Sequence, residues 1–165
     1  MLNKNHLQKW IAIYTKSRHE KVVTNTLIDQ GYKAYLPMLK KKRKWSDRKV
    51  WVEFPLFKSY VFVQTEISNT LFISQINGVV KIIKFNGKVA IIQDESIEAI
   101  KLMINGGYAP KSIDYFIKGD PVRVIKGPLK GLIGEVTQLE NQNRLLIKVD
   151  AIQHSLSIKI DPLFL

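Results

Sequence analysis

The sequence predicts an α+β domain, an antiparallel-sheet sandwich with helices, followed by a small all-β barrel. Two observations support this assignment. Strand-like and helix-like patterns alternate over residues 1–110, whereas residues 111–165 contain only short β-rich runs with turn residues between them. At the junction, two adjacent glycines and a nearby proline are typical of an interdomain linker. We therefore expect an N-terminal domain over 1–106, a linker over 107–116 and a barrel over 117–165.

Apolar spacing and β-propensity mark the elements of the first segment. Strands are expected over 10–16, 33–39, 50–54, 59–65, 79–85 and 89–92, and helices over 18–30, over 67–76 and from Asp94 onward. Asn86-Gly87 is a strong hairpin signal between the last two strands. The apolar positions at helical spacing are Val22, Val23, Leu27 and Ile28 in the first helix and Ile97, Ile100 and Ile104 in the last.

The second segment contains four β-rich runs, which we expect as strands over 121–126, 132–139, 145–152 and 155–160. A segment of about fifty residues has only a small independent core. We therefore expect tight turns and a closed sheet to stabilise it.

The charge of the chain indicates a polyanionic partner. There are 26 Lys and Arg against 14 Asp and Glu, a formal net charge of +12. Residues 1–110 hold 18 of these cations and 8 of the acids, whereas residues 111–165 hold 8 and 6. The first segment, with a net charge of +10 against +2, is therefore the expected polyanion-binding part.

Catalytic and metal chemistry find no support in the sequence. The chain has no cysteine, its three histidines are scattered, and the loop over 126–131 lacks the ending of a phosphate-binding P-loop. Asp94-Glu95 is better explained by a helix N-terminus than by acid–base catalysis. No apolar stretch is long enough to span a bilayer. We expect a cytoplasmic protein that is not an enzyme and binds no cofactor or metal.

Residues 40–49 carry seven cations and one acid, a pattern that suits contact with phosphates. Trp45 lies within this run and could stack on an unpaired base, whereas the strand pattern around Trp51 favours a core position for that side chain. The competing interpretation is that the run forms a solvated hairpin tip. The candidate nucleic-acid-binding residues of the run are Lys40, Lys41, Lys42, Arg43, Lys44, Trp45, Arg48 and Lys49. A second basic group lies near the end of the first strand and comprises Lys16, Arg18, His19 and Lys21.

The second segment resembles a KOW module, the small barrel of NusG proteins and some ribosomal proteins. The similarity rests on the runs Gly119-Asp120-Pro121-Val122-Arg123-Val124 and Gly127-Pro128-Leu129-Lys130-Gly131-Leu132-Ile133-Gly134-Glu135-Val136. The motif residues that match are Gly119, Asp120, Val122, Val124, Gly127, Gly131 and Gly134.

The first segment resembles the NusG N-terminal domain. The matching residues are Trp10 with Tyr14, Arg18-His19-Glu20-Lys21, Tyr35-Leu36-Pro37, Pro55-Leu56-Phe57, Tyr60-Val61-Phe62-Val63 and Gly78-Val79-Val80. Three runs, namely Tyr14-Thr15-Lys16, Leu36-Pro37-Met38 and Trp45-Ser46-Asp47-Arg48-Lys49, are more similar to the specialised paralogues RfaH and the UpxY antiterminators. Lys58-Ser59 stands where the family favours Pro-Gly.

The resemblance implies contacts with RNA polymerase and with nucleic acid beside it. An apolar patch on the N-terminal sheet would bind the clamp helices of the polymerase, and the residues that match it are Tyr14, Phe57, Tyr60 and Ile83. The segment Ser68-Asn69-Thr70 matches the region that touches the opposite wall of the cleft. Strand alternation leaves open whether Tyr60 or Val61 faces the core, and helix capping explains Ser68 and Asn69 equally well. The basic group around Lys16 would face the non-template DNA strand, and nascent RNA is a second possible nucleic-acid partner of the chain.

The function expected from these residues is transcription antitermination or elongation. The KOW module would recruit a second protein, and Rho, a small-subunit ribosomal protein or neither remains open. Two alternatives also remain, because KOW modules occur in ribosome-associated and general RNA-binding proteins, and because a basic domain suits a DNA-binding regulator that acts without polymerase.

Overall fold

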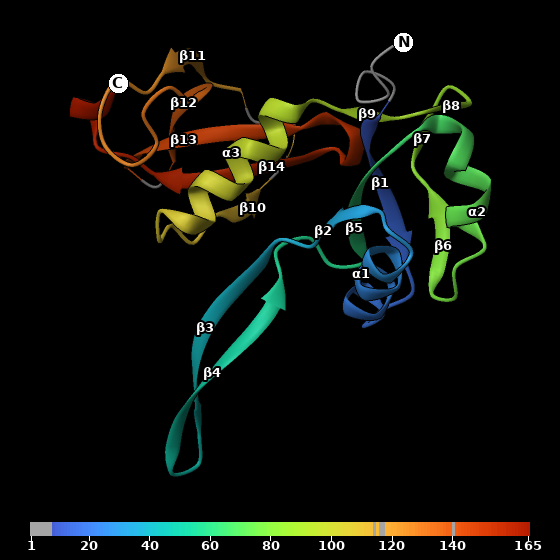
Figure 1. Cartoon of the computed structure of the whole chain (residues 1–165). Helices are drawn as coiled ribbons and strands as arrows, with labels where there is room; N and C mark the ends of the chain where they lie inside the picture. Colours follow the sequence, from blue (N-terminus) through green and yellow to red (C-terminus); the bar gives the residue numbers. More distant parts are fainter. Residues whose placement is uncertain (1–7, 114, 116–117, 140) are drawn as a thin grey trace. The chain divides into compact units, whose positions relative to one another are not determined.

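The computed structural model describes residues 8–165 apart from 114, 116, 117 and 140. The chain divides into two compact units, Met1–Gln93 and Asp94–Leu165, and each is described by itself (Figure 1). The helix that follows residue 93 therefore belongs to the second unit. The predicted linker and barrel include 114, 116, 117 and 140, which lie outside the described residues. The domain boundary at residue 106 stays a prediction.

The first unit combines one main antiparallel sheet with short helices. Its elements are β1 (Lys9–Thr15), α1 (Glu20–Asp29), β2 (Lys33–Tyr35), β3 (Met38–Trp45), β4 (Arg48–Pro55), β5 (Tyr60–Thr65), the 3₁₀ helix η2 (Ile67–Asn69), α2 (Thr70–Ser74), β6 (Val79–Ile82), β7 (Lys84–Phe85), β8 (Lys88–Val89) and β9 (Ile91–Ile92). The sheet has the order β2-β5-β1-β6, and β9 also pairs with β1. The predicted α+β class is confirmed for this unit.

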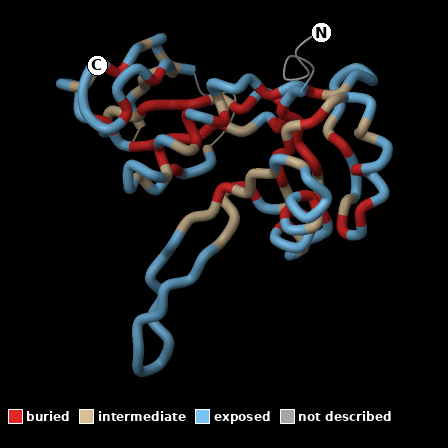
Figure 2. The backbone as a smooth tube through the Cα atoms, viewed as in Figure 1, coloured by how far each residue is buried: buried red, intermediate tan, exposed pale blue. Residues whose placement is uncertain are grey.

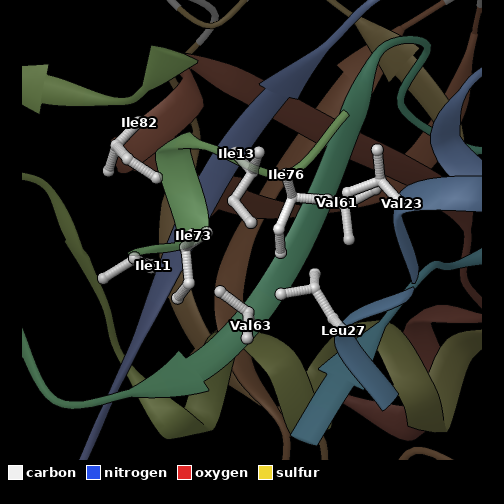
Figure 3. Packing of buried hydrophobic residues seen from close by; sticks show 9 residues of the cluster. All are labelled: Ile11, Ile13, Val23, Leu27, Val61, Val63, Ile73, Ile76 and Ile82. Carbon is white, nitrogen blue, oxygen red and sulfur yellow. The ribbon is translucent and has the colours of Figure 1, made fainter. Parts of the chain in front are cut away.

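The core of the first unit lies between the sheet and its helices. Alternate residues of β1 and β5 point to one face, where they pack against apolar side chains of α1 and α2. Figure 3 shows nine members of this cluster, which are Ile11, Ile13, Val23, Leu27, Val61, Val63, Ile73, Ile76 and Ile82. The two central strands are thereby fixed in register.

The opposite face of the central strands is buried in part. Trp10 and Ala12 of β1 and Phe62 of β5 are as inaccessible as the residues between them. Of the two alternatives for β5, the set with Val61 faces the core, and Tyr60 is half-buried. Alternation fails at Phe62, which is buried as well. A near-continuous apolar run is typical of strands that are covered on both faces.

Helix α1 presents a narrower apolar stripe than its sequence predicts. Val23 and Leu27 are buried, but Val22 is 55% and Ile28 is 52% exposed. Positions 23 and 27 are four residues apart and share a face, while their apolar neighbours turn towards solvent.

The β3–β4 hairpin differs most from the predicted elements. The sequence predicted strands over 33–39 and 50–54 on either side of the basic run, whereas the run itself forms strands paired from Met38↔Pro55 to Trp45↔Arg48. Pro37 separates β2 from β3, and its carbonyl accepts the Leu56 amide at 2.8 Å. Nearly the whole hairpin is exposed and projects from the body of its unit (Figures 1 and 2).

The hairpin predicted at Asn86-Gly87 is confirmed. Strands β7 and β8 pair directly on either side of it. Both turn residues have positive φ, 48° for Asn86 and 77° for Gly87, as a type I′ turn requires. The ladder is short, because β9 pairs with β1 instead of extending it.

The second unit is one helix followed by a five-stranded antiparallel sheet. Its elements are α3 (Asp94–Asn105), β10 (Lys111–Ile113), β11 (Asp120–Arg123), β12 (Ile133–Leu139), β13 (Gln142–Val149), η3 (Asp150–Ile152), β14 (His154–Lys159) and η4 (Pro162–Phe164). The strand order is β10-β14-β13-β12-β11. All four predicted β-rich runs form strands, and β10 is an additional strand within the expected linker. Closure of this sheet into a KOW barrel stays a prediction.

Two glycines allow close packing within the second unit. A Cβ atom on Gly119 would collide with the Val136 carbonyl, and one on Gly134 would collide with the Leu146 carbonyl. Both positions therefore require the absence of a side chain. Leu145, Ile147 and Val149 alternate along β13 to form part of the core.

Candidate nucleic-acid and protein interface

The two faces of the β3–β4 hairpin both carry cations and one tryptophan. Residues directly opposite in the ladder share a face, and faces alternate along each strand. One face comprises Lys40, Lys42, Lys44, Lys49, Trp51 and Glu53, and the other comprises Lys41, Arg43, Trp45, Arg48, Val50 and Val52. Every residue from Lys40 to Glu53 is exposed. The predicted basic candidates are thus brought together on a ribbon that phosphates can reach from either side.

Both hairpin tryptophans are open to solvent. Trp45 is 67% exposed, as its predicted stacking role requires, and Trp51 is 62% exposed. The prediction that Trp51 belongs to the core is wrong, because β4 starts at the hairpin tip and has not yet returned to the body of the unit at this position. The Lys42 ammonium lies 5.5 Å from the centroid of the Trp51 ring, a cation–π distance.

A groove joins the hairpin to helix α1. It has a volume of about 670 Å³ and is lined by Lys21, Lys40, Trp51, Val52 and Glu53. One Glu53 oxygen lies 3.7 Å from the Lys21 ammonium, and the other lies 3.4 Å from the Lys40 ammonium. Lys21, which the sequence grouped with the first strand's end, therefore lies beside the hairpin lysines.

The second predicted basic group lies on the turn between β1 and α1. Lys16 and Arg18 are exposed, and His19 is half-buried. The Lys16 amide donates to the Gly78 carbonyl at 2.8 Å, and Arg18 has a φ of +63°, which is uncommon for a residue with a side chain. A fixed turn thus holds these cations at one end of the sheet.

Glu20 positions the turn that precedes the aromatic candidates. Its carboxylate is buried and accepts the Ser59 amide at 2.8 Å, while the Ser59 carbonyl accepts the Thr15 amide at 2.8 Å. Ser59 has a φ of +63°, which is uncommon for a residue with a side chain. Sequence reasoning gave Glu20 no separate role, because its partner Ser59 is 39 positions away in the chain.

Tyr14 and Tyr60 form the aromatic part of the candidate polymerase surface. They are directly paired in the β1–β5 ladder, with ring centroids 5.3 Å apart in an edge-on arrangement. The Lys81 ammonium lies 5.8 Å from the Tyr14 ring centroid. Partial burial, together with the neighbouring Tyr14, raises the pKa of Tyr60. Both phenols are half-buried, so each retains accessible surface.

The other two members of the predicted patch differ in accessibility. Phe57 is 1% exposed and packs edge-on against Phe62, with centroids 5.8 Å apart. It therefore lies in the core of this structure rather than on an open patch. Ile83 is half-buried, and its amide donates to the Ala12 carbonyl at 3.0 Å.

Residues 68–70 lie where η2 passes into α2. The Thr70 hydroxyl donates to the Ile67 carbonyl at 2.7 Å, and the side-chain amide nitrogen of Asn69 donates to the Thr65 hydroxyl at 3.4 Å. Neither helix has a side-chain hydrogen bond at its N-cap, so Asn69 occupies the cap position of α2 without a capping contact. Ser68 is exposed. Beside these residues, Leu71 and Phe72 expose large apolar side chains that sequence reasoning missed.

The predicted KOW residues surround the start of β11 and the turn that follows it. The Gly119 amide donates to a Glu135 oxygen at 2.9 Å, and the Lys148 ammonium lies 3.1 Å from the other Glu135 oxygen. Partial burial alone would raise the pKa of Glu135, but the Gly119 amide and the Lys148 ammonium together lower it. Asp120 is exposed, Val122 is half-buried and Val124 is buried. Gly127 and Gly131 have positive φ on either side of the turn.

Among residues 8–165 without the four undescribed positions, no three His, Asp or Glu side chains are placed to hold a metal ion. Within the same described part of the chain, no helix is both long and apolar enough to cross a membrane.

Comparison with known proteins gives one family and one supporting fold. The family model described as transcription termination factor nusG matches residues 8–101, more than half of the chain. A structure titled for domain interaction in Thermotoga maritima NusG is 18% identical over 93% of this chain and 94% of that chain, with a TM-score of 0.52. Two conformations of an MjSpt4:Spt5 complex also match. Conformation A is 18% identical over 92% of this chain and 93% of that chain, with a TM-score of 0.30. Conformation B is 20% identical over 91% of each chain, with a TM-score of 0.31.

Proposed function

This chain belongs to the NusG family of transcription factors, and on that premise we propose that it is a transcription elongation or antitermination factor. Its N-terminal unit binds RNA polymerase, and its β3–β4 hairpin binds exposed nucleic acid in the elongation complex. The chain carries out no catalysis in this role.

The observation that carries the proposal is the hairpin itself. A ribbon with seven exposed cations from Lys40 to Lys49 gains no folding stability from so much like charge, because cross-strand neighbours such as Lys44 and Lys49 repel each other. Phosphates would relieve that repulsion and release counterions. The exposed Trp45 adds a stacking surface that suits unpaired bases.

The candidate polymerase surface is centred on Tyr14 and Tyr60. Aromatic side chains that remain partly accessible are typical of interface centres. The neighbouring Lys81 places a cation at the rim. Ile83 remains a candidate member of this surface. Residues 68–70 would instead contact the opposite wall of the polymerase cleft, as the resemblance implies, and the exposed Leu71 and Phe72 beside them would add apolar area there.

The second unit serves as a protein-binding module in this proposal. Residues 111–165 have a net charge of only +2, which disfavours binding to RNA by electrostatic attraction alone. Rho or a small-subunit ribosomal protein is the class of partner that its KOW-like motif implies. The run over 45–49 favours a specialised paralogue that serves particular operons, so occupancy by this factor would be confined to few transcription units.

The decisive experiment is a pull-down from nuclease-treated extract with the full chain as bait. Retention of core RNA polymerase after nuclease treatment supports the proposal. Retention of ribosomal particles instead would favour a ribosome-associated protein. Loss of every partner on nuclease treatment, with DNA binding intact, would favour a regulator that acts without polymerase.

A further inference from the structure

We propose that the groove between α1 and the β3–β4 hairpin is a subsite for one unpaired base of a single-stranded nucleic acid, with a preference for guanine. Trp51 stacks on the base, Lys21 and Lys40 bind its flanking phosphates, and Glu53 reads its edge. The inference rests on the proposed function, because it gives a base preference to a hairpin otherwise expected to bind phosphates alone.

The side chains that line the groove contribute little to folding stability. Trp51 is 62% exposed, so its ring adds little to the core. The two ion pairs of Glu53 are solvent-exposed, with side-chain exposures of 60%, 68% and 44% for Lys21, Lys40 and Glu53. Exposed pairs of this kind add little to folding stability. Their spacing is therefore better explained by a ligand than by the fold.

The charges of the groove suit a nucleotide. Two ammonium groups lie within 3.7 Å of one carboxylate, so the cluster of three keeps a net positive charge. Lys42 adds a third cation at 5.5 Å from the centre of the Trp51 ring. Each ammonium has three donors, so a lysine can hold Glu53 and still donate to a phosphate. A volume of about 670 Å³ is ample for a nucleobase and its sugar.

Glu53 gives the groove its selectivity. An ionised carboxylate only accepts hydrogen bonds, so it favours base edges that present donors. Guanine presents two neighbouring N–H donors on its Watson–Crick edge, adenine and cytosine present one amino group, and thymine presents one N–H between two carbonyl oxygens. Those edges are open only in an unpaired base, which is also when an aromatic ring can stack on it.

The test measures binding of the full chain to labelled oligo(dT) of about twelve nucleotides, carrying at its centre one guanine, adenine, cytosine or thymine. We expect the guanine-containing strand to bind about five-fold tighter than the all-thymine strand. Trp51→Ala should weaken binding to every strand by about five-fold or more, while Trp51→Phe should retain most of the affinity. Both variants should unfold at the same temperature as the unmodified chain, because the Trp51 ring is exposed and does not support the fold.

Glu53→Gln should abolish the guanine preference while tightening binding to the all-thymine strand, because one negative charge is removed. Asp47→Asn at the hairpin tip is the matched control, since it removes the same charge outside the groove and should keep the preference. A guanine preference that survives Glu53→Gln, or full affinity in Trp51→Ala, would overturn the subsite while leaving the proposed hairpin function intact. Failure of the unmodified chain to bind any strand would overturn both. Binding of the same strands in ribonucleotide form is then measured. The subsite is assigned to RNA or to DNA according to which of the two series binds more tightly.

Discussion

At the scale of single residues, the structure separates two aromatic positions that the sequence treated alike. Tyr60 keeps accessible surface beside Tyr14, whereas Phe57 is enclosed against Phe62. The two positions should therefore respond differently to truncation.

We expect Tyr60→Ala to weaken binding to core polymerase by about 1 to 3 kcal/mol, since it removes an interface anchor. Phe57→Ala should instead lower the free energy of unfolding by about 3 to 5 kcal/mol, because it leaves a cavity. Titration with purified polymerase and denaturant unfolding of each variant distinguish the two effects. Equal loss of stability in both variants would assign Tyr60 to the core as well.

Glu135 gives the second unit a stability that depends on pH. Its folded-state pKa is lowered from a usual value of 4.5, so the carboxylate contributes stability that is present above that value. The contribution is lost as the pH falls through the lowered pKa. Glu135→Gln should therefore lower the Tm more at pH 7 than near about pH 3.

Calorimetric unfolding of the full chain over that pH range checks this expectation. Glu98→Gln is the matched control, because Glu98 is exposed on α3 and its pair with Lys101 lies at the surface. A difference of the same size at both pH values would show that Glu135 acts through packing instead of charge.

At the scale of elements, the hairpin cations provide the clearest quantitative prediction. If five of them contact single-stranded phosphates, the logarithm of affinity should fall with that of salt at a slope of about −0.7 per contact. Replacing Lys40, Lys41, Lys42, Arg43 and Lys44 with Gln should flatten that slope by roughly 3 to 4. Binding to polymerase through Tyr14 and Tyr60 should persist. An unchanged slope would leave Lys16, Arg18 and Lys21 as the better candidates.

The sequence predicts most element types but not where strands leave the core. The alternating and apolar patterns locate β1, β5, α1 and the β7–β8 turn, because local spacing and turn chemistry decide them. Whether the Trp51 side chain is exposed or buried depends on the length of the β3–β4 ladder, and no local sequence pattern encodes that length. Lysine-rich strands also have low β-propensity, so cross-strand pairing overrides it here.

In the candidate site too, local sequence features were predicted and contacts between distant segments were not. The cation cluster could be predicted from the sequence, because its members are neighbours in one run and no knowledge of the tertiary structure is needed to group them. The pairing of Lys21 with Lys40 through Glu53 was not, because it joins α1 to β3 and β4 across the fold. The turn role of Glu20 was also hidden, since its acceptor contact to Ser59 spans 39 positions.

At the scale of the whole molecule, we expect the two halves to have separable tasks. Residues 1–106 alone should bind core polymerase in a purified assay, and Tyr60→Ala in that fragment is the matched control. Deletion of 113–165 from the full chain should leave polymerase binding largely intact while abolishing recruitment of a second protein. Tight RNA binding by the isolated second segment at physiological salt would contradict its role as a protein-binding module.

The hairpin also bears on how the molecule avoids self-association. Its two strands form a sheet of their own, and among the described residues neither outer edge pairs with another strand. Such open edges are templates for aggregation, and lysine is a common gatekeeper against it. Edge-to-edge pairing of two copies would bring two cationic ribbons together, so their repulsion opposes this pairing. High salt should weaken that protection, and light scattering across a salt series would then reveal larger particles as repulsion is screened.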